Sequence, residues 1–365
     1  MRNLPSLTSL RFLAAIWVVL FHLAPQWDAL RHFGLVATIV DVGYSGVTLF
    51  FVLSGFILSY NYLNRDVPVK KFWVARAARV LPVYLFALIL SAPFDLHTCH
   101  KLGISFFPTA LYAPLLIQSW IPKAALLWNG PGWSLSCEAF FYLLFPFIVV
   151  PTARLFRRNF VGVFAIVWLL GMLPSLLYAF GQPEGLVDSG SHATLLSFIK
   201  FNPVLRLPEF ILGIGIGTCY VDGRRFSKPL AAAVLSVLGL VVLLIGLSRM
   251  PYPALHNALL VPIYGTLIFS LACDPKILGN PILVLLGESS YSLYLLFGST
   301  HSMCSILARR CGLSGQNIVN VGYLMIALLV AIAGYKLIEV PGRVFIRSRL
   351  AVADRKSLAV AGSAS

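Results

Sequence analysis

The stretch RFLAAIWVVLFH (residues 11–22) is an apolar run with an arginine at one end and a histidine at the other. Eleven positions at about 100° and about 1.5 Å each place Arg11 and His22 on nearly the same helical face, about 16 Å apart along the axis. That separation is about half of the ~30 Å hydrocarbon thickness of a bilayer. The stretch therefore predicts a membrane helix that carries polar groups at two depths.

The composition extends this prediction to the whole chain. Of the 365 residues, 59% are hydrophobic and 11% are charged, and the mean hydropathy is +0.86. A water-soluble domain could not bury so much apolar surface, so we expect an all-α, polytopic transmembrane helical bundle. Ten apolar runs have about the length of a span: 8–26, 43–62, 80–94, 134–153, 159–180, 207–221, 229–248, 255–273, 281–303 and 317–338.

The segment FFPTALYAPLLIQSWIP, near residues 104–121, is apolar but contains three prolines. Hydropathy leaves open whether it spans the membrane or re-enters. If it spanned, Arg154, Arg157 and Arg158 would face outward, against the bias that keeps basic residues in short cytoplasmic loops. A re-entrant segment therefore predicts about ten spans with both termini cytoplasmic.

The net charge of +15 is explained by this topology and by anionic lipid, and we expect no nucleic-acid binding. Residues 1–345 are expected to form a single transmembrane domain, and residues 346–365 a disordered cytoplasmic tail. The six cysteines show no C-x-x-C pair, so neither a disulfide framework nor a metal site is predicted.

Ionisable residues inside spans are costly and are candidates for function. Glu138 lies in GPGWSLSCEAFFYLLFP (residues 130–146), about one turn into the predicted fourth span. The predicted depth of Glu138 matches that of His22, which makes the two residues candidate partners. A carboxylate bonded to an imidazole orients the ring and raises the basicity of the imidazole. Other interpretations are an interfacial His22 bonded to a backbone carbonyl, a snorkelling Arg11, and a structural Glu138 bonded to Ser134 or Ser136.

Two cytoplasmic arginines form a further candidate site. Arg76 and Arg79 are three positions apart in KKFWVARAARVLPVY, so they share a helix face and suit phosphate groups. The alternative is that they belong only to the positive-inside cluster.

Small and hydroxyl residues mark two other spans. Ser54 and Gly55 lie at mid-depth, where they allow either close helix packing or close approach of a ligand. In GESSYSLYLLF (residues 287–297), Tyr291 and Ser292 supply hydroxyls for a polar tunnel or for bonds between helices. Arg206 and Glu209 in LRLPEFILG are most simply a local ion pair.

Taken in order, these motifs resemble one family. Arg11 and His22 with ten residues between them are followed by GVTLFFVLSGFIL, ARAARVLPVY, GWSLSCEAFFYLLFP, RLPEFILG, SYSLYL and IEVPGR. This series is similar to that of acyltransferase family 3, the integral membrane O-acyltransferases that modify bacterial surface polysaccharides. The resemblance covers residues 5–345, nearly the whole chain.

The resemblance implies transfer of an acyl group, usually acetyl, from cytoplasmic acetyl-CoA to a hydroxyl of a cell-surface or exported polysaccharide or its lipid-linked precursor. Acetyl-CoA is then a substrate, and no cofactor is bound permanently. The implied partners are the saccharide acceptor, membrane lipids, and proteins of polysaccharide biosynthesis or export. The implied location is the bacterial cytoplasmic (inner) membrane.

The family motifs fall on particular residues of this chain. His22 is implied to be catalytic, with Glu138 as its expected supporting carboxylate. Arg76 and Arg79, together with Arg11, are implied to handle the donor. The residues expected to support the substrate tunnel are Ser54, Gly55, Trp133, Ser134, Tyr291 and Ser292.

The chain also departs from the family pattern. Members commonly end the SYSLYL helix with a histidine, where this chain has Phe297 and no histidine before His301. The acidic residue that often follows the glutamate is Ala139 here. We expect no fused esterase-like domain of the kind that some members carry, so onward transfer would need a separate protein.

Two mechanisms and several functions stay open. His22 either deprotonates the acceptor hydroxyl or carries the acyl group as an acyl-imidazole. The alternative acceptors are a small secreted metabolite, such as a macrolide, or a lipid. A secondary transporter would require two related halves with paired broken helices, and the sequence shows one broken segment and no such symmetry. A purely structural protein would need neither His22 nor Glu138.

Overall fold

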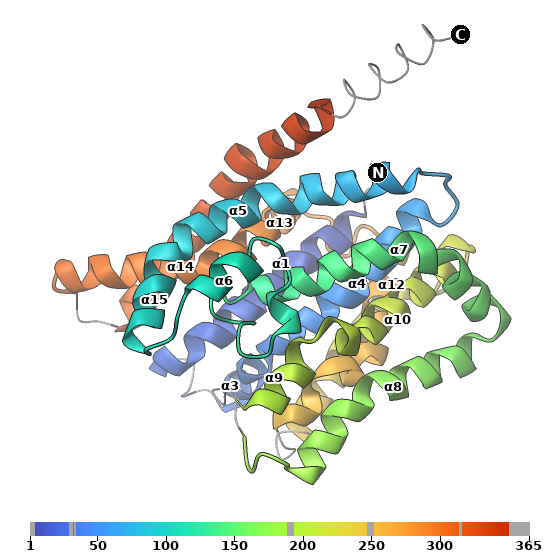
Figure 1. The fold of residues 1–365 in the computed structure, drawn as a ribbon. Helices are drawn as coiled ribbons and strands as arrows, with labels where there is room; N and C mark the ends of the chain where they lie inside the picture. Colours follow the sequence, from blue (N-terminus) through green and yellow to red (C-terminus); the bar gives the residue numbers. More distant parts are fainter. Residues whose placement is uncertain are drawn as a thin grey trace, which may run out of the picture.

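The computed structural model of the chain describes residues 4–28, 32, 34–187, 193–246, 252–313 and 316–349. Within these residues the secondary structure is helical and no strand occurs, which confirms the predicted fold class (Figure 1). The helices are α1 (Pro5–Leu23), α3 (Gly34–Asp41), α4 (Gly46–Tyr62), α5 (Val69–Lys101), α6 (Phe107–Tyr112), α7 (Gly132–Arg158), α8 (Phe160–Gly181), α9 (Thr194–Phe201), α10 (Pro203–Val221), α11 (Pro229–Gly246), α12 (Val261–Cys273), α13 (Pro281–Glu288), α14 (Ser290–Arg310) and α15 (Gln316–Gly334).

The described helices account for the predicted spans. Eight are long and apolar enough to cross a membrane. The bent pair α13–α14, with a bend of 62°, is apolar and long enough to count as a ninth if its two parts form one span, and a shorter apolar helix covers Asn257–Cys273. The chain is therefore a multi-pass membrane protein whose apolar segments match the ten predicted runs.

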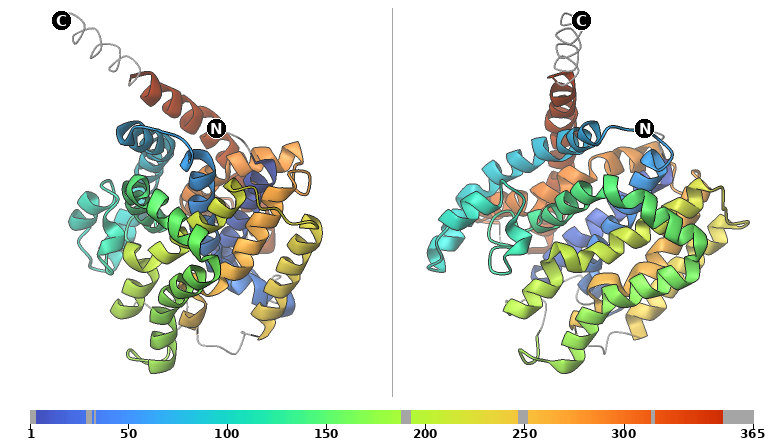
Figure 2. Two further views of the ribbon diagram at one scale, coloured as in Figure 1. Left: turned by 90° about the vertical axis from the view of Figure 1, so that its right-hand side faces the viewer. Right: turned by 45° about the vertical axis from the view of Figure 1, so that its right-hand side comes forward.

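Successive spans alternate in direction and so define two faces of the bundle (Figures 1 and 2). The basic face holds the start of α1 and the connections 63–68, 159, 222–228 and 274–280. The outer face holds the connections 102–131 and 252–260 and the described residues 182–187 and 193–202. That the basic face is cytoplasmic stays a prediction from charge.

The segment near 104–121 does not form a helical span. Its helix α6 has six residues and is only about 9 Å long. The chain that follows folds against the bundle instead: the amide of Gln118 donates to the Gly132 carbonyl at 2.9 Å, and the Ser119 hydroxyl donates to the Trp133 carbonyl at 2.6 Å. Consequently α7 begins among buried side chains.

The C-terminal helix continues past residue 345, the predicted end of the transmembrane domain. The last helix continues from α15 through a π-helical stretch, Tyr335–Glu339, as far as Arg349. Residues 346–349 of the predicted tail are thus helical, and residues 350–365 lie outside the described part.

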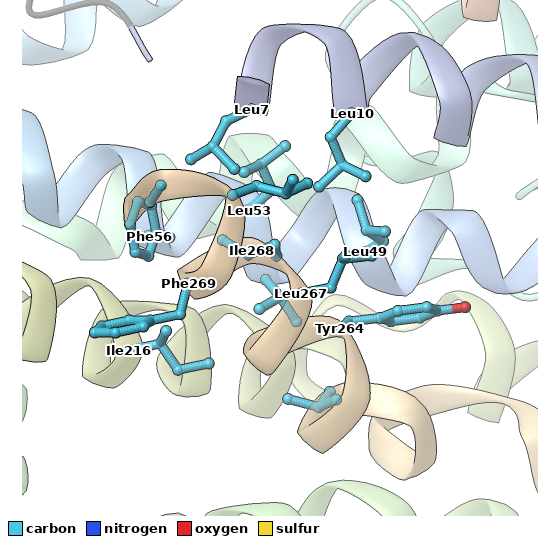
Figure 3. Packing of buried hydrophobic residues seen from close by; sticks show 14 of the residues in the cluster. Leu7, Leu10, Leu49, Leu53, Phe56, Ile216, Tyr264, Leu267, Ile268 and Phe269 are labelled. Atoms are coloured by element: carbon cyan, nitrogen blue, oxygen red, sulfur yellow. The ribbon is translucent and has the colours of Figure 1, made fainter. Parts of the chain in front are cut away.

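The centre of the bundle is the contact between α4 and α10. A Cβ added at Gly55 would lie 2.2 Å from the Phe210 carbonyl oxygen, and one added at Gly213 would lie 2.1 Å from that of Val52. Leucine and aromatic side chains from α1, α4, α10 and α12 pack around this contact (Figure 3). Of the two roles predicted for Gly55, the structure therefore shows close helix packing.

Candidate active site

A cavity of about 390 Å³, here called the outer cavity, opens toward the outer face. His22 from α1 and Trp133 from α7 line it, together with residues of α14 and of the connections on that face. Its volume is within the range of small-molecule sites. Further polar and aromatic lining residues are Tyr44, Lys200, Tyr252 and His256.

His22 is held in a defined tautomer. Its Nδ1 lies 2.7 Å from the carbonyl oxygen of Val18, one turn back on α1. A carbonyl only accepts, so Nδ1 carries the proton and Nε2 of the neutral ring keeps its lone pair. The rings of Phe21 and Phe297 lie against the imidazole, each with a centroid separation of 5.0 Å. His22 is thus arranged as a base or nucleophile.

Two smaller cavities of about 50 Å³ each, here called the inner cavities, lie nearer the basic face. Arg11, Arg79, Glu138 and Tyr142 line both of them. One inner cavity extends to Ser134 and Tyr291, and the other extends to Ser54 and Arg76. The structure therefore gathers all three predicted donor arginines and Glu138, from α1, α5 and α7.

The predicted pair between His22 and Glu138 is wrong in this structure. The Tyr142 hydroxyl, one turn along α7, donates to Glu138 Oε2 at 2.7 Å, and Ser54 lies 3.4 Å from the Tyr142 oxygen. Each member of the expected pair has a partner four residues away on its own helix. The pair also fails because α7 starts inside the bundle, which places Glu138 beside Arg11 instead of beside His22.

Arg76 and Glu339 complete the polar surroundings of the inner cavities. The Arg76 guanidinium lies 5.8 to 6.0 Å from the ring centroids of Tyr62, Phe72 and Tyr142. Glu339, in the π-helical stretch, is buried, forms an ion pair with Arg343 and interacts electrostatically with Arg79 and Arg11. The motif IEVPGR contains Glu339, for which the sequence predicted no role, although an acidic residue at the end of a span is a candidate for function.

Tyr294 stands between the two kinds of cavity. It lines the outer cavity and also the inner cavity that contains Ser134. The Ser134 hydroxyl donates to the Tyr294 oxygen at 3.0 Å, and the Phe50 ring meets the Tyr294 ring edge-on at 5.9 Å. The sequence indicated hydroxyls in this span but did not single out Tyr294.

Other residues noted from the sequence make contacts between helices. The Tyr291 hydroxyl donates to the Val80 carbonyl at 2.8 Å and so joins α14 to α5. Ser292 faces α15, because a Cβ added at Gly334 would lie 3.3 Å from its oxygen. His301 packs against the Tyr323 ring. Neither Ser292 nor His301 lines the outer or inner cavities.

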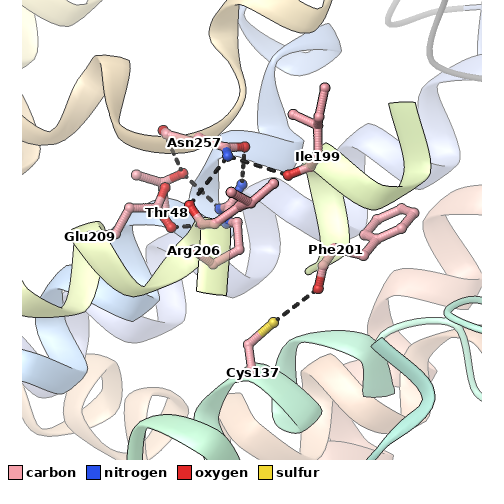
Figure 4. Close-up of polar contacts among 8 residues, drawn as sticks. Thr48, Cys137, Ile199, Phe201, Arg206, Glu209 and Asn257 are labelled. Atoms are coloured by element: carbon pink, nitrogen blue, oxygen red, sulfur yellow. Dashed lines mark hydrogen bonds and ion pairs between the residues drawn. The ribbon is translucent and has the colours of Figure 1, made fainter. Parts of the chain in front are cut away.

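A buried ion pair supports the wall of the outer cavity (Figure 4). Arg206 Nε lies 2.9 Å from Glu209 Oε2, which confirms the predicted local pair. Arg206 also donates to Thr48 at 3.1 Å and to the side-chain oxygen of Asn257 at 3.2 Å. These bonds tie α10 to α4 and to the turn that carries His256.

The fold and the site together define a class of protein: a multi-pass membrane protein with a histidine in a cavity at one depth and an arginine cluster at another. The acyltransferase domain of family 3 matches residues 4–336, so the chain belongs to this family and is an acyltransferase.

Several named proteins are similar to the chain. Acyltransferase MdmB of Streptomyces mycarofaciens is 29% identical over 80% of this chain and 78% of its own length. O-acetyltransferase OatA of Staphylococcus aureus is 27% identical over 94% of this chain, which spans only 57% of OatA. The putative O-acetyltransferase SACOL0978 of S. aureus is 25% identical, again over 94% of this chain and 58% of its own length. No solved structure matches the chain significantly.

Proposed function

We propose that the protein is an O-acetyltransferase of the bacterial cytoplasmic membrane. It moves an acetyl group from acetyl-CoA on the basic, cytoplasmic face to a hydroxyl of an exported or cell-surface polysaccharide or its lipid-linked precursor. Two similar proteins carry the name O-acetyltransferase, which supports acetyl as the transferred group. The saccharide acceptor follows from the family resemblance.

The observation that carries the proposal is the series of cavities. Arg11, Arg76 and Arg79 lie around the inner cavities, Tyr294 borders both kinds of cavity, and His22 lines the outer cavity. Guanidinium groups suit the phosphates of CoA. The extended pantetheine arm would bring the thioester past Tyr294 to His22.

At His22 the reaction needs one proton transfer from the acceptor hydroxyl. In direct transfer, Nε2 takes that proton, the hydroxyl oxygen attacks the thioester carbonyl, and the thiolate of CoA leaves and is protonated. In the two-step scheme, Nε2 itself attacks the carbonyl and expels the thiolate of CoA. The acceptor oxygen then attacks the acyl-imidazole and displaces Nε2, and the proton that the hydroxyl loses balances the thiolate, so that CoA is released as the thiol. Both schemes use the same nitrogen, which the Nδ1 bond to Val18 keeps available.

Glu138 acts near the donor in this proposal. It shares the inner cavities with Arg11 and Arg79, so its carboxylate offsets their charge and fixes Tyr142 through their hydrogen bond. This assignment replaces the expected role of orienting His22.

The test uses inside-out membrane vesicles from cells that contain or lack the protein, supplied with acetyl-labelled acetyl-CoA. We expect protein-dependent label in the saccharide fraction, stable to washing and released by mild base as an ester. Label in an organic extract would instead identify a small metabolite or a lipid as acceptor. The absence of any covalent label from well-folded protein would contradict acetyl transfer and favour the transporter.

A further inference from the structure

The half of α8 nearest the basic face lies at the edge of the ribbon in Figure 1, and side chains such as Phe160, Phe164 and Val167 pack against the bundle while only partly buried. The buried residues of α8 are Gly171, Ser175, Tyr178 and Ala179, all in its C-terminal half. A cavity of about 620 Å³, here called the α8 cavity, lies between the other half and helices α10 and α12. It shares no lining residue with the outer or inner cavities.

The walls of the α8 cavity are apolar. Phe160 and Phe164 of α8 face Ile216 of α10 and Phe269 of α12. Along α12 the lining runs from Pro262 to Phe269, which is about 10 Å of helix. Water gains few hydrogen bonds in such a space, and an empty cavity forfeits the dispersion contacts of its walls. An elongated apolar group fits it best.

The end of the α8 cavity at the basic face is cationic. Arg224 and Arg225 line it there. The Arg225 guanidinium lies 3.7 Å from the Tyr220 ring centroid and donates to the Tyr220 carbonyl at 2.7 Å, so it is held in position. The neighbouring Asp222 accepts three hydrogen bonds from Arg157, at 2.6 to 3.2 Å. Arg157 thus holds that carboxylate by hydrogen bonds, while its interaction with Arg224 is electrostatic only.

We propose that the α8 cavity binds one anionic phospholipid, with an acyl chain between α8, α10 and α12 and the phosphate beside Arg224 and Arg225. An apolar slot that ends in adjacent guanidinium groups is complementary to this chemistry. A zwitterionic lipid would fill the slot but would gain less at the arginines. The inference does not depend on the acyl transfer proposed above.

The test is native mass spectrometry of the full chain, released from nanodiscs made of equal parts phosphatidylglycerol and phosphatidylcholine. Wild-type protein should retain phosphatidylglycerol in preference to phosphatidylcholine. The double variant Arg224→Gln/Arg225→Gln should lower that preference by about fivefold for each arginine. The matched control is Arg309→Gln/Arg310→Gln, which changes two adjacent exposed arginines at the opposite end of the bundle and should leave the preference unchanged.

A second variant separates the slot from its charge. Thr266→Phe places a ring in the α8 cavity while both arginines remain, and it should release the retained lipid. Equal retention of the two lipids by wild-type protein would overturn the proposal. Equal losses from both arginine pairs would show general surface charge instead, and full retention by Thr266→Phe would exclude the slot. Because the wild-type result stands alone, a variant that fails to fold does not remove the test.

Discussion

The outer cavity and the inner cavities differ in size and in the groups that line them. The outer cavity has about 390 Å³ of free space around a histidine and several aromatic rings. The inner cavities have about 50 Å³ each, although three arginines and a glutamate surround them. The outer cavity therefore has room for a ligand in the present structure. In the inner cavities, side chains fill most of the space around the charged groups. The comparison indicates that donor binding must move side chains, while acceptor binding uses space that already exists.

The largest effect should come from the outer cavity. His22→Gln removes the basic nitrogen and should lower kcat by about 10²- to 10⁴-fold while the apparent donor KM changes little. His301→Gln is the matched control, because this histidine packs against Tyr323 outside the cavity. Rates of label transfer at varied acetyl-CoA measure both. A His22 variant that transfers at half the wild-type rate would remove the catalytic assignment.

The next effect should come from the inner cavities. Arg79→Ala removes one phosphate-binding guanidinium and should raise the apparent donor KM about tenfold, with a smaller change in kcat. Arg154→Ala, an exposed arginine on α7, serves as the control. If Arg79→Ala lowers kcat and leaves the donor KM unchanged, the inner cavities are not the donor site.

Tyr294, at the boundary between the outer cavity and the inner cavities, should limit the hydrolysis of acetyl-CoA by water. Tyr294→Ala removes the ring that borders both cavities, so water would reach the thioester and acceptor-independent hydrolysis of acetyl-CoA should rise several-fold. Tyr294→Phe keeps the ring and loses only the bond from Ser134, so its hydrolysis should stay near the wild-type rate. Free CoA thiol, released without acceptor, is the quantity to follow. An unchanged rate in Tyr294→Ala would mean that Tyr294 does not separate the cavities.

The smallest effect should be a change in stability at Asp222, on the basic face and outside the outer and inner cavities. Hydrogen bonds from Arg157 lower the pKa of Asp222 below its ordinary value. A lowered carboxyl pKa stabilises the fold above the unfolded pKa of about 3.9, and the contribution is lost as pH falls through the folded value. Because the pair is partly exposed, Asp222→Asn should lower the free energy of unfolding by only about 0.5 kcal/mol. The difference in Tm from wild type should be constant between about pH 5 and pH 8 and shrink below about pH 4; a difference that grows on acidification would contradict this origin.

The sequence predicted the helical spans well because the membrane requires long apolar segments. It also predicted that Arg11, Arg76, Arg79 and Glu138 matter, and the structure brings these four together. It misplaced Glu138 because depth was counted from the start of an apolar run. The chain before α7 folds back into the bundle, and contacts such as Gln118 with Gly132 leave no mark in hydropathy.

The sequence analysis left local partners open for both residues. The bond of His22 to the Val18 carbonyl is the backbone alternative that it kept, whereas Glu138 bonds to Tyr142 and not to Ser134 or Ser136. The position of Tyr294 between the cavities follows from how α14 packs against α1 and α5 and bonds to Ser134 of α7. No local pattern distinguishes it from Tyr291, three residues earlier in the same motif.

Sealed vesicles of both orientations test whether donor and acceptor meet from opposite faces of the membrane. Acetyl-CoA does not cross the bilayer, so labelled donor added outside reaches the basic face only in inside-out vesicles. We expect label in the enclosed saccharide of inside-out vesicles, and none in right-side-out vesicles until they are permeabilised. Equal labelling in both orientations, or labelling only in right-side-out vesicles, would contradict transfer across the membrane.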